Sequence, residues 1–210
     1  MAVPARKMNP KRRTASKDER QTQLIKATIR TIAKRGLSDT TMAVVAGEAK
    51  LSQGIINLHF QSKERLLVET LRYVVDEYRA AWESALDRAG SDSAKRLATL
   101  VAVDFTPKVC DRNKLAVWFA FWGESKSRPT YRKLCAERDD QYDKMLQQLC
   151  NDIILEGGYD EVESEIVAHG LAAMTEGLWL DILITPSSMS REHAAAVCMA
   201  YLHRYFPKHF

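Results

Sequence analysis

Apolar side chains recur three and four residues apart along most of this chain, which is the spacing of one face of an α-helix. Glycines and prolines fall between these periodic segments, and few stretches alternate between apolar and polar residues as a strand would. The pattern therefore predicts an all-α protein of about nine helices, without an internal repeat. The predicted helices span residues 18–35, 42–50, 53–58, 66–88, 94–105, 113–124, 130–156, 160–183 and 190–205.

Two of the predicted helices are short and lie close together between residues 39 and 67. Thr41 is a typical N-cap residue for the first and Ser52 for the second. Ile56 and Phe60 are four residues apart, so they would pack the second helix onto the first. Two short helices joined by a tight turn form a helix-turn-helix, whose second helix enters the DNA major groove by its N-terminal end. A helical hairpin that only packs is the alternative.

Positive charge is concentrated at the N-terminal end of the chain. Residues 1–65 contain 14 Lys or Arg and 5 Asp or Glu, whereas residues 66–210 contain 17 and 22. Basic charge beside a helix-turn-helix is the electrostatic footprint of a phosphate-binding surface. Residues 1–17 contain basic residues and no acid, which predicts a flexible basic arm. This arm could follow the minor groove or the phosphates, or serve only as a solubilising tail.

The composition is that of an ordinary soluble globular protein, with 46% hydrophobic and 28% charged residues among 210. No apolar run approaches the roughly 18 residues that a membrane span needs, and the charged N-terminus lacks the apolar segment of a signal peptide. The cysteines form no C-x-x-C pair, so we expect reduced thiols in the core rather than disulfides or a zinc site. These features predict a cytoplasmic protein that does not enter a membrane. The cysteines are Cys110, Cys135, Cys150 and Cys198.

The sequence lacks the patterns of an enzyme. Its five histidines are scattered, and no nucleophile elbow, phosphate-binding loop or paired metal-ligand motif is present. Glu165 and His169 are one helical turn apart, but a di-iron bundle needs this spacing twice, together with further carboxylates. We therefore predict no catalytic residues, no metal and no cofactor.

Residues 18–67 resemble the tetracycline-repressor (TetR) family of bacterial transcription factors. The resemblance is carried by Gly36, Thr41, Ala46, Ala49, Ser52, Gly54, Phe60, Ser62, Lys63 and Leu66. It implies a TetR-like, all-α homodimer with a three-helix DNA-binding head and a larger helical body for ligand binding and dimerisation. The chain is then divided into the basic arm (1–17), the helix-turn-helix domain (18–65) and the body (66–210). The resemblance also implies that the last two helices pair across the dimer as a four-helix bundle.

The body resembles a subgroup of this family, the choline-responsive repressors of glycine-betaine synthesis. This similarity lies in segment 118–122, in Pro129 and Tyr131, and in segments 170–173 and 177–180. The head departs from the family at Lys50, where a glycine is usual in the turn; a left-handed lysine would cost on the order of 1 kcal/mol. It departs again at Leu58-His59-Phe60, which replaces the more usual His-Tyr-Phe. Asn57 is also unusual, so the operator could differ from that of the subgroup.

The second short helix carries the residue types that read DNA. Gln53 and Asn57 are four residues apart and can each pair with an adenine edge, and Ile55 could meet a thymine methyl group. Gly54 would let the backbone approach the duplex, while Thr41, His59 and Lys63 would contact phosphates. A solvated helix face is the alternative for Gln53 and Asn57. The predicted DNA-binding residues are Thr41, Ser52, Gln53, Gly54, Ile55, Asn57, His59 and Lys63.

Aromatic residues in the body are candidates for an effector site. Trp118, Phe121 and Trp122 share one helix face by i, i+3 and i+4 spacing. Aromatic faces around a cavity hold a quaternary ammonium by cation–π attraction, about 2 kcal/mol per favourable desolvated contact, and a carboxylate such as Glu176 or Asp104 would neutralise it. Trp82 could complete the cage, although an aromatic stripe can equally be plain core. The predicted ligand-binding residues are Trp118, Phe121, Trp122, Trp179, Glu176, Phe105 and Tyr73.

The resemblance implies three partners: double-stranded operator DNA, a second copy of the chain, and a small effector, choline or a similar quaternary ammonium. The dimer would bind two half-sites about one helical turn of DNA apart. Choline would favour a conformation whose heads no longer match this spacing, and so control genes of glycine-betaine synthesis or uptake. The alternatives are a sensor of another hydrophobic or cationic compound that controls efflux or catabolic genes, and a helical scaffold with a vestigial head.

Overall fold

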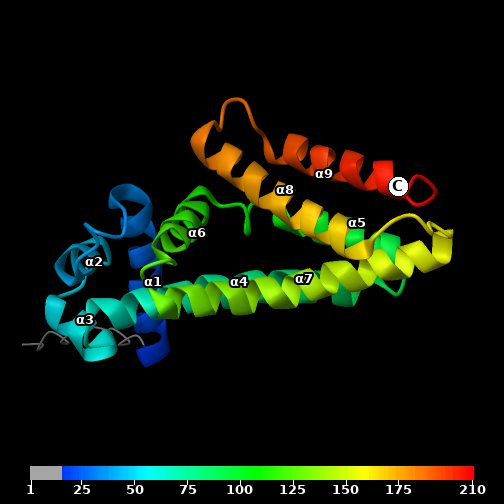
Figure 1. Cartoon of the computed structure of the whole chain (residues 1–210). Coiled ribbons are helices and arrows are strands. Elements are labelled where there is room, and N and C mark those ends of the chain that lie inside the picture. Colours follow the sequence, from blue (N-terminus) through cyan, green and yellow to red (C-terminus); the bar gives the residue numbers. More distant parts are fainter. Residues whose placement is uncertain (1–15) are drawn as a thin grey trace, which may run out of the picture.

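The computed structural model describes residues 16–210, apart from the side chains of Arg138 and Asp139. All regular elements in this range are α-helices, which confirms the predicted fold class (Figure 1). The predicted basic arm lies outside the described residues except for its last two positions. The helices of the described range are α1 (Lys17–Arg35), α2 (Met42–Glu48), α3 (Gln53–Phe60), α4 (Lys63–Ala89), α5 (Ser93–Asp104), α6 (Arg112–Glu124), α7 (Pro129–Gly157), α8 (Ser164–Ile184) and α9 (Arg191–Tyr205).

Helices α1, α2 and α3 form the head, in which α1 is the support. A capping box begins α1: the Ser16 hydroxyl accepts a hydrogen bond from Glu19 N, and Ser16 N donates to the Glu19 carboxylate. The helix ends at Gly36, whose positive φ lies in the region that favours glycine. Gly36 has φ 77° and ψ 173°, because the chain straightens into a loop in which Thr40 Oγ1 donates to Gly36 O at 2.7 Å.

The turn between α2 and α3 has the geometry that the sequence predicts. Lys50 has a φ of 56°, in the left-handed region where the family usually has glycine. Leu51 N then donates to Ala46 O at 2.9 Å and closes the turn. A second left-handed residue, Gln61 (φ 62°), ends α3 and was not predicted. Each costs on the order of 1–2 kcal/mol, which the buried contacts of the head must offset.

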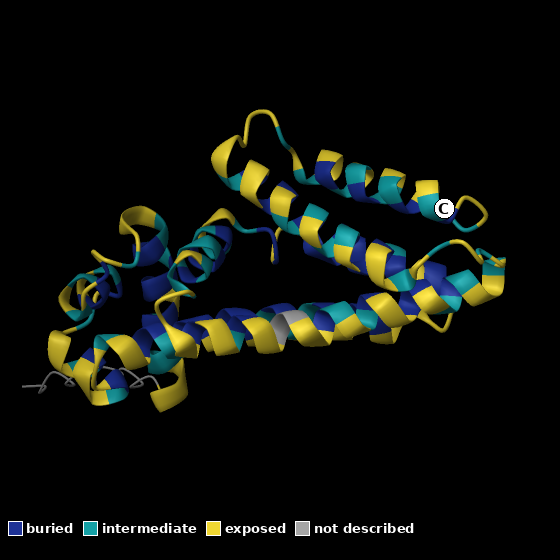
Figure 2. Cartoon of the chain, viewed as in Figure 1, coloured by how far each residue is buried: buried dark blue, intermediate teal, exposed yellow. Residues whose placement is uncertain are grey.

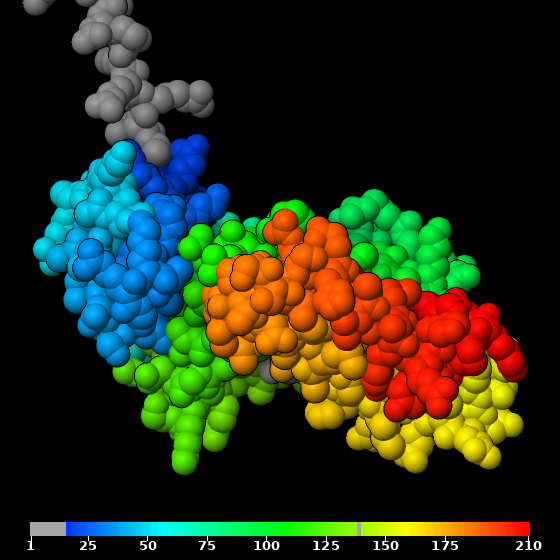
Figure 3. Space-filling view, turned by 90° about the horizontal axis from the view of Figure 1, so that it is seen from above, coloured from blue at the N-terminus to red at the C-terminus, as the bar shows by residue number. Residues whose placement is uncertain are grey.

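Helix α4 joins the head to the body without interruption. It begins at Lys63, where the Ser62 hydroxyl caps the helix by accepting a hydrogen bond from Arg65 N. The helix therefore runs through the predicted domain boundary at residue 65. The space-filling view places the head at one end of an elongated molecule, with α8 and α9 spread across one face of the body (Figure 3).

The body packs α4, α5, α6, α7 and α8 around a core that includes Trp118, Trp179 and Phe121. The predicted reduced, buried cysteines are confirmed, since all four are free and buried. Helix α8 begins at Ser164 rather than at 160, because residues after Tyr159 form a turn in which Val162 N donates to Tyr159 O. At Gly170 a side chain would collide with the Tyr201 hydroxyl, so this glycine lets α9 approach α8 within the chain.

Helix α8 carries more apolar surface than the sequence analysis expected. Among the described residues it is the one helix long and apolar enough to cross a membrane, with a mean hydropathy of 1.3. This corrects the expectation that no apolar segment approaches that length. One side of α8 is core, including Leu171, Trp179 and Ile182, whereas the other side is exposed (Figure 2).

Candidate DNA-binding and effector sites

Helix α3 has two distinct faces. Ile56 and Phe60 are fully buried against the rest of the head. Ile55 and His59 are half-buried at the edges, and His59 Nδ1 is enclosed without a hydrogen-bond partner among the described residues. The opposite face is open to solvent (Figure 2). We call it the α3 face, and it consists of Gln53, Gly54, Asn57 and Leu58.

The helix starts of the head differ in how their backbone amides are satisfied. The Thr41 hydroxyl caps α2 by accepting a hydrogen bond from Val44 N at 3.2 Å. At α3, the exposed Ser52 makes no such side-chain cap. The amides of Gln53 and Gly54 thus begin the helix without a side-chain acceptor, and helix N-termini of this kind bind phosphate oxygens.

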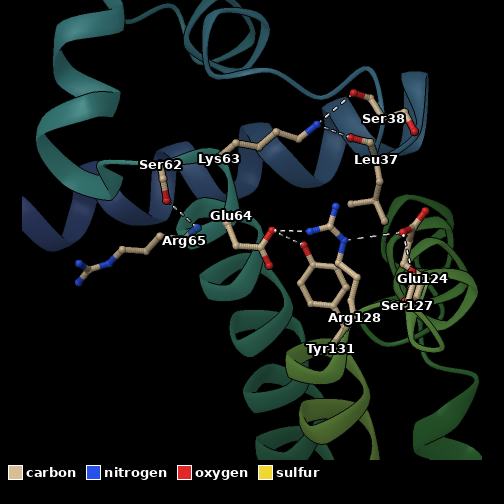
Figure 4. A network of polar contacts seen from close by, with 10 residues as sticks. All are labelled: Leu37, Ser38, Ser62, Lys63, Glu64, Arg65, Glu124, Ser127, Arg128 and Tyr131. Carbon is tan, nitrogen blue, oxygen red and sulfur yellow. Dashed lines mark hydrogen bonds and ion pairs between the residues drawn. The ribbon is translucent and has the colours of Figure 1, made fainter.

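Lys63 has a role that the sequence analysis missed. Its ammonium group donates to the backbone oxygens of Leu37 at 2.9 Å and Ser38 at 3.0 Å (Figure 4). These bonds tie the start of α4 to the loop after α1. An ammonium has three donors, so one remains for the predicted phosphate contact. The signal for the structural role was weak, because the partners are backbone groups about 25 residues earlier in the chain.

In the body, the carboxylate of Asp104 is the centre of a buried polar cluster. Asp104 is only 1% exposed. Its two oxygens accept hydrogen bonds from the hydroxyl groups of Tyr78, at 2.7 Å, and Tyr142, at 2.6 Å. Burial and the neighbouring Asp104 charge raise the pKa of Tyr142 well above its ordinary value, so this hydroxyl stays a donor. The three residues come from α4, α5 and α7.

Aromatic rings from several helices gather near Asp104. Trp179 Nε1 donates to the backbone oxygen of Asp104 at 3.0 Å, and its ring meets the ring of Tyr78 edge-on, with centroids 5.7 Å apart. The ring of Tyr142 lies 5.6 Å from Tyr78 and 6.2 Å from Trp82. We call Tyr78, Trp82, Tyr142 and Trp179, with Asp104, the aromatic box.

The predicted effector residues separate into two groups. Trp179 is in the aromatic box, and Phe105 is buried next to Asp104. The α6 residues form a second group: Trp118 and Trp122 have ring centroids 6.0 Å apart, and Phe121 packs edge-on against Tyr131 at 4.8 Å.

A small pocket joins these groups, because Tyr78 and Trp118 both line it. Its free space is about 10 Å³, which is room for one water molecule. Glu176 is half-buried on α8, and Tyr73 lines a different groove, between α1 and α6.

Tyr78 and Tyr142 were missed as site residues. Tyr142 lies on a helix rich in charged residues, which obscures its apolar side. The spacing of Cys135, Tyr142, Leu146 and Leu149 does mark a buried side of that helix, and this was the available signal.

Three charged side chains and Tyr131 connect α6 and α7 of the body to the first turn of α4, which follows the head directly. Arg128, just before α7, forms ion pairs with Glu64 on α4, at 3.1 Å, and Glu124 on α6, at 3.8 Å (Figure 4). The Tyr131 hydroxyl donates to the same Glu64 oxygen at 3.3 Å. Burial and the Glu64 charge raise the pKa of Tyr131 to about 12. We call Glu64, Glu124, Arg128 and Tyr131 the junction network.

Comparison with known proteins agrees with this arrangement of head and body. Residues 24–70 match the model of the bacterial regulatory proteins of the tetR family, and residues 93–207 match the C-terminal domain of BetI-type transcriptional repressors. The chain is 36% identical over 163 residues to the HTH-type transcriptional regulator BetI of Burkholderia thailandensis, which covers 77% of this chain and 80% of that protein. It is 29% identical to BetI of Stenotrophomonas maltophilia, over 87% of this chain and 91% of that one.

Solved structures have the same fold. A transcriptional regulator from Pseudomonas aeruginosa is 25% identical, with a TM-score of 0.79 over 94% of this chain and 100% of that one. A regulator from Saccharomonospora viridis, solved in complex with choline, is 24% identical, with a TM-score of 0.76 over 89% of this chain and 96% of that one. The chain belongs to the TetR family of transcriptional regulators, which are not enzymes, and has a BetI-type C-terminal domain.

Proposed function

We propose that this DNA-binding repressor acts as a cytoplasmic homodimer whose affinity for operator DNA falls when a small quaternary ammonium, with choline as the first candidate, enters the aromatic box. The genes it controls would be those of glycine-betaine synthesis or uptake. The observation that carries the effector part is the buried Asp104 carboxylate, which accepts hydrogen bonds from Tyr78 and Tyr142, whose rings in turn contact those of Trp179 and Trp82. The choline bound to the S. viridis regulator supports the choice of ligand.

The α3 face is the proposed DNA-reading surface. Gln53 and Asn57 are both exposed on it, and each amide can pair bidentately with an adenine edge. The free amides at the start of α3 and the exposed Thr41 would contact the phosphates on either side. Gly54 has open space where a side chain would be, so the backbone can lie close to the bases.

The exposed side of α8 is the proposed dimer seam. Ile166, Leu180 and Ile184 are 55%, 38% and 65% exposed, respectively. Ala173 and Gly177 are also exposed between them, and no atom lies within 4 Å of a side chain built at Gly177. An apolar stripe with small residues at its centre suits close packing against a second copy of the helix, as in the interface core of a homodimer.

A quaternary ammonium suits the aromatic box because it is a cation without N–H donors. It gains cation–π attraction from ring faces and needs no hydrogen-bond acceptor. The Asp104 carboxylate would supply the negative charge at short range, in a site from which water is excluded. The neighbouring pocket has room for one water molecule only, so a larger cation has to move the rings apart as it binds.

This movement can reach the head, because the same helices carry the box and the junction network. Tyr78 and Glu64 are both on α4, and Tyr142 and Tyr131 are both on α7. Separating α4 from α7 at the box would pull on the Glu64 contacts with Arg128 and Tyr131. The effector can shift the equilibrium only by its difference in affinity for the two forms, so a partial weakening of the DNA complex is consistent with this route.

A mobility-shift assay on the DNA flanking the gene for this protein, with and without choline, tests the proposal. We expect a shifted complex of dimeric stoichiometry that weakens as choline is added. Tryptophan fluorescence in parallel should change on titration with choline. A complex that ignores choline but responds to another hydrophobic or cationic compound would favour the alternative sensor, and the absence of any salt-dependent shift would overturn the proposal.

A further inference from the structure

Leu58 lies on the α3 face although its side chain is apolar. It is 78% exposed, more than any other large hydrophobic residue of the described range. Its neighbours along the chain, Asn57 and His59, are polar. A single exposed leucine is ordinary on a protein surface, so its exposure alone carries no function. Its place on the helix is what matters.

Helix geometry puts Leu58 on the surface proposed to meet DNA, one turn after Gly54. Side chains four residues apart lie one turn above each other, so Gln53 and Asn57 form one row, and Gly54 and Leu58 form the next. Gly54 has no side chain, and a carbon added there would meet only the Ser52 hydroxyl, at 3.9 Å. The leucine therefore stands clear on the side of the helix that faces away from Ile56 and Phe60.

The major groove offers one apolar group, the C5-methyl of thymine. We infer that Leu58 contacts a thymine methyl in each half-site of the operator, and so specifies a T at that position. This inference rests on the proposed DNA-binding function. It reassigns the methyl contact that the sequence suggests for Ile55, because Ile55 is half-buried whereas Leu58 stands free.

A protein partner fits this surface less well. Exposed apolar patches that bind proteins are contiguous, and the residues around Leu58 on the α3 face are Gln53, Gly54 and Asn57. Residues 1–65, which include the head, also carry the excess of basic residues of the chain, which suits a polyanion. Polar groups beside one apolar contact match the mixed edge of a base pair.

Replacing thymine by deoxyuridine removes only the methyl group and leaves base pairing intact, so it tests the contact directly. We would footprint the protein on the DNA flanking its gene, then replace each thymine of the footprint in turn and measure Kd by fluorescence anisotropy. For the unmodified protein we expect one position per half-site at which uracil weakens binding about fourfold, the value for burying one CH₂ group.

The same panel of duplexes is measured for three variants. The Leu58→Ala variant should bind duplexes with thymine or uracil at that position equally well. The Leu58→Met variant should still bind the thymine duplex more tightly. Leu155→Ala is the matched control, because Leu155 is 75% exposed on α7, outside the head; it should bind as the unmodified protein does. Circular dichroism checks that each variant is folded.

The outcomes separate the inference from the function on which it depends. A Leu58→Ala protein that binds the operator with an unchanged uracil profile overturns the methyl contact while leaving the repressor intact. A profile with no methyl-sensitive position for the unmodified protein overturns it as well. A protein that does not bind its flanking DNA at all overturns the proposed function.

Discussion

The α3 face exposes its polar groups to solvent, whereas the aromatic box buries them. On α3, Gln53 and Asn57 extend into solvent from a helix held only by its other side. In the box, Asp104 is buried, and both of its oxygens accept hydrogen bonds from tyrosines of two other helices. A surface that reads DNA must leave its donors and acceptors available, whereas a site that detects a small cation must keep water away from its charge. Substitutions on the α3 face should therefore change DNA binding alone, whereas substitutions in the box should change both ligand binding and stability.

The largest effect is expected where the head is held together. Phe60→Ala should lower the free energy of unfolding by about 3–5 kcal/mol and abolish DNA binding, because Phe60 is 1% exposed at the base of α3. Urea denaturation followed by circular dichroism measures the loss. Asn57→Ala on the opposite face is the control, with a change within about 0.5 kcal/mol; an equal loss in both variants would contradict the two-faced description of α3.

A substitution in the aromatic box should lower both the affinity for choline and the free energy of unfolding. Asp104→Asn removes the charge and leaves one tyrosine hydroxyl without its acceptor, so unfolding should be easier by about 1–3 kcal/mol. Choline affinity, measured by calorimetry, should fall at least about tenfold, as for the loss of about 1.4 kcal/mol. The operator affinity without choline should be unchanged. Asp76→Asn, exposed on α4, is the control; choline binding that survives Asp104→Asn would remove Asp104 from the site.

Substitutions on the α3 face should change the affinity for DNA without changing the free energy of unfolding. Gln53→Ala or Asn57→Ala should cost about 1–3 kcal/mol of discrimination against mismatched operators. Lys63→Ala should instead weaken all DNA alike, and should also destabilise the head, since Lys63 holds the oxygens of Leu37 and Ser38. Mobility shifts on matched and mismatched duplexes distinguish the two classes. Identical behaviour of both would contradict this assignment of roles.

The substitution with the smallest expected effect on the free energy of unfolding should change how strongly choline binding affects DNA binding. Arg128→Ala removes ion pairs between residues that are about half exposed, worth about 0–1 kcal/mol. The variant should bind the operator and choline nearly normally, but choline should weaken its DNA complex less. Lys133→Ala, which removes an exposed pair with Glu137 within α7, is the control. An unaltered choline response in Arg128→Ala would place the coupling elsewhere than the junction network.

The sequence predicted the head better than the box, and the reason is the range of the interactions. The cap at Thr41 and the left-handed Lys50 are local, so a few neighbouring residues determine them. The box depends on side chains that meet only in the fold: Tyr78 and Tyr142 lie 26 and 38 residues from Asp104. Spacing on one helix could group Trp118 with Trp122, but it could not say that Trp179 packs against Tyr78 instead.

The continuity of α4 limits which insertions and deletions this protein can accept during evolution. Glu64 and Tyr78 belong to one unbroken helix, about 21 Å apart along its axis. Inserting or deleting a single residue between them would turn one relative to the other by about 100°. A flexible linker would tolerate such insertions and deletions, but this helix would not. A functional chimera that takes its head from a relative would have to keep the same number of residues between these two positions.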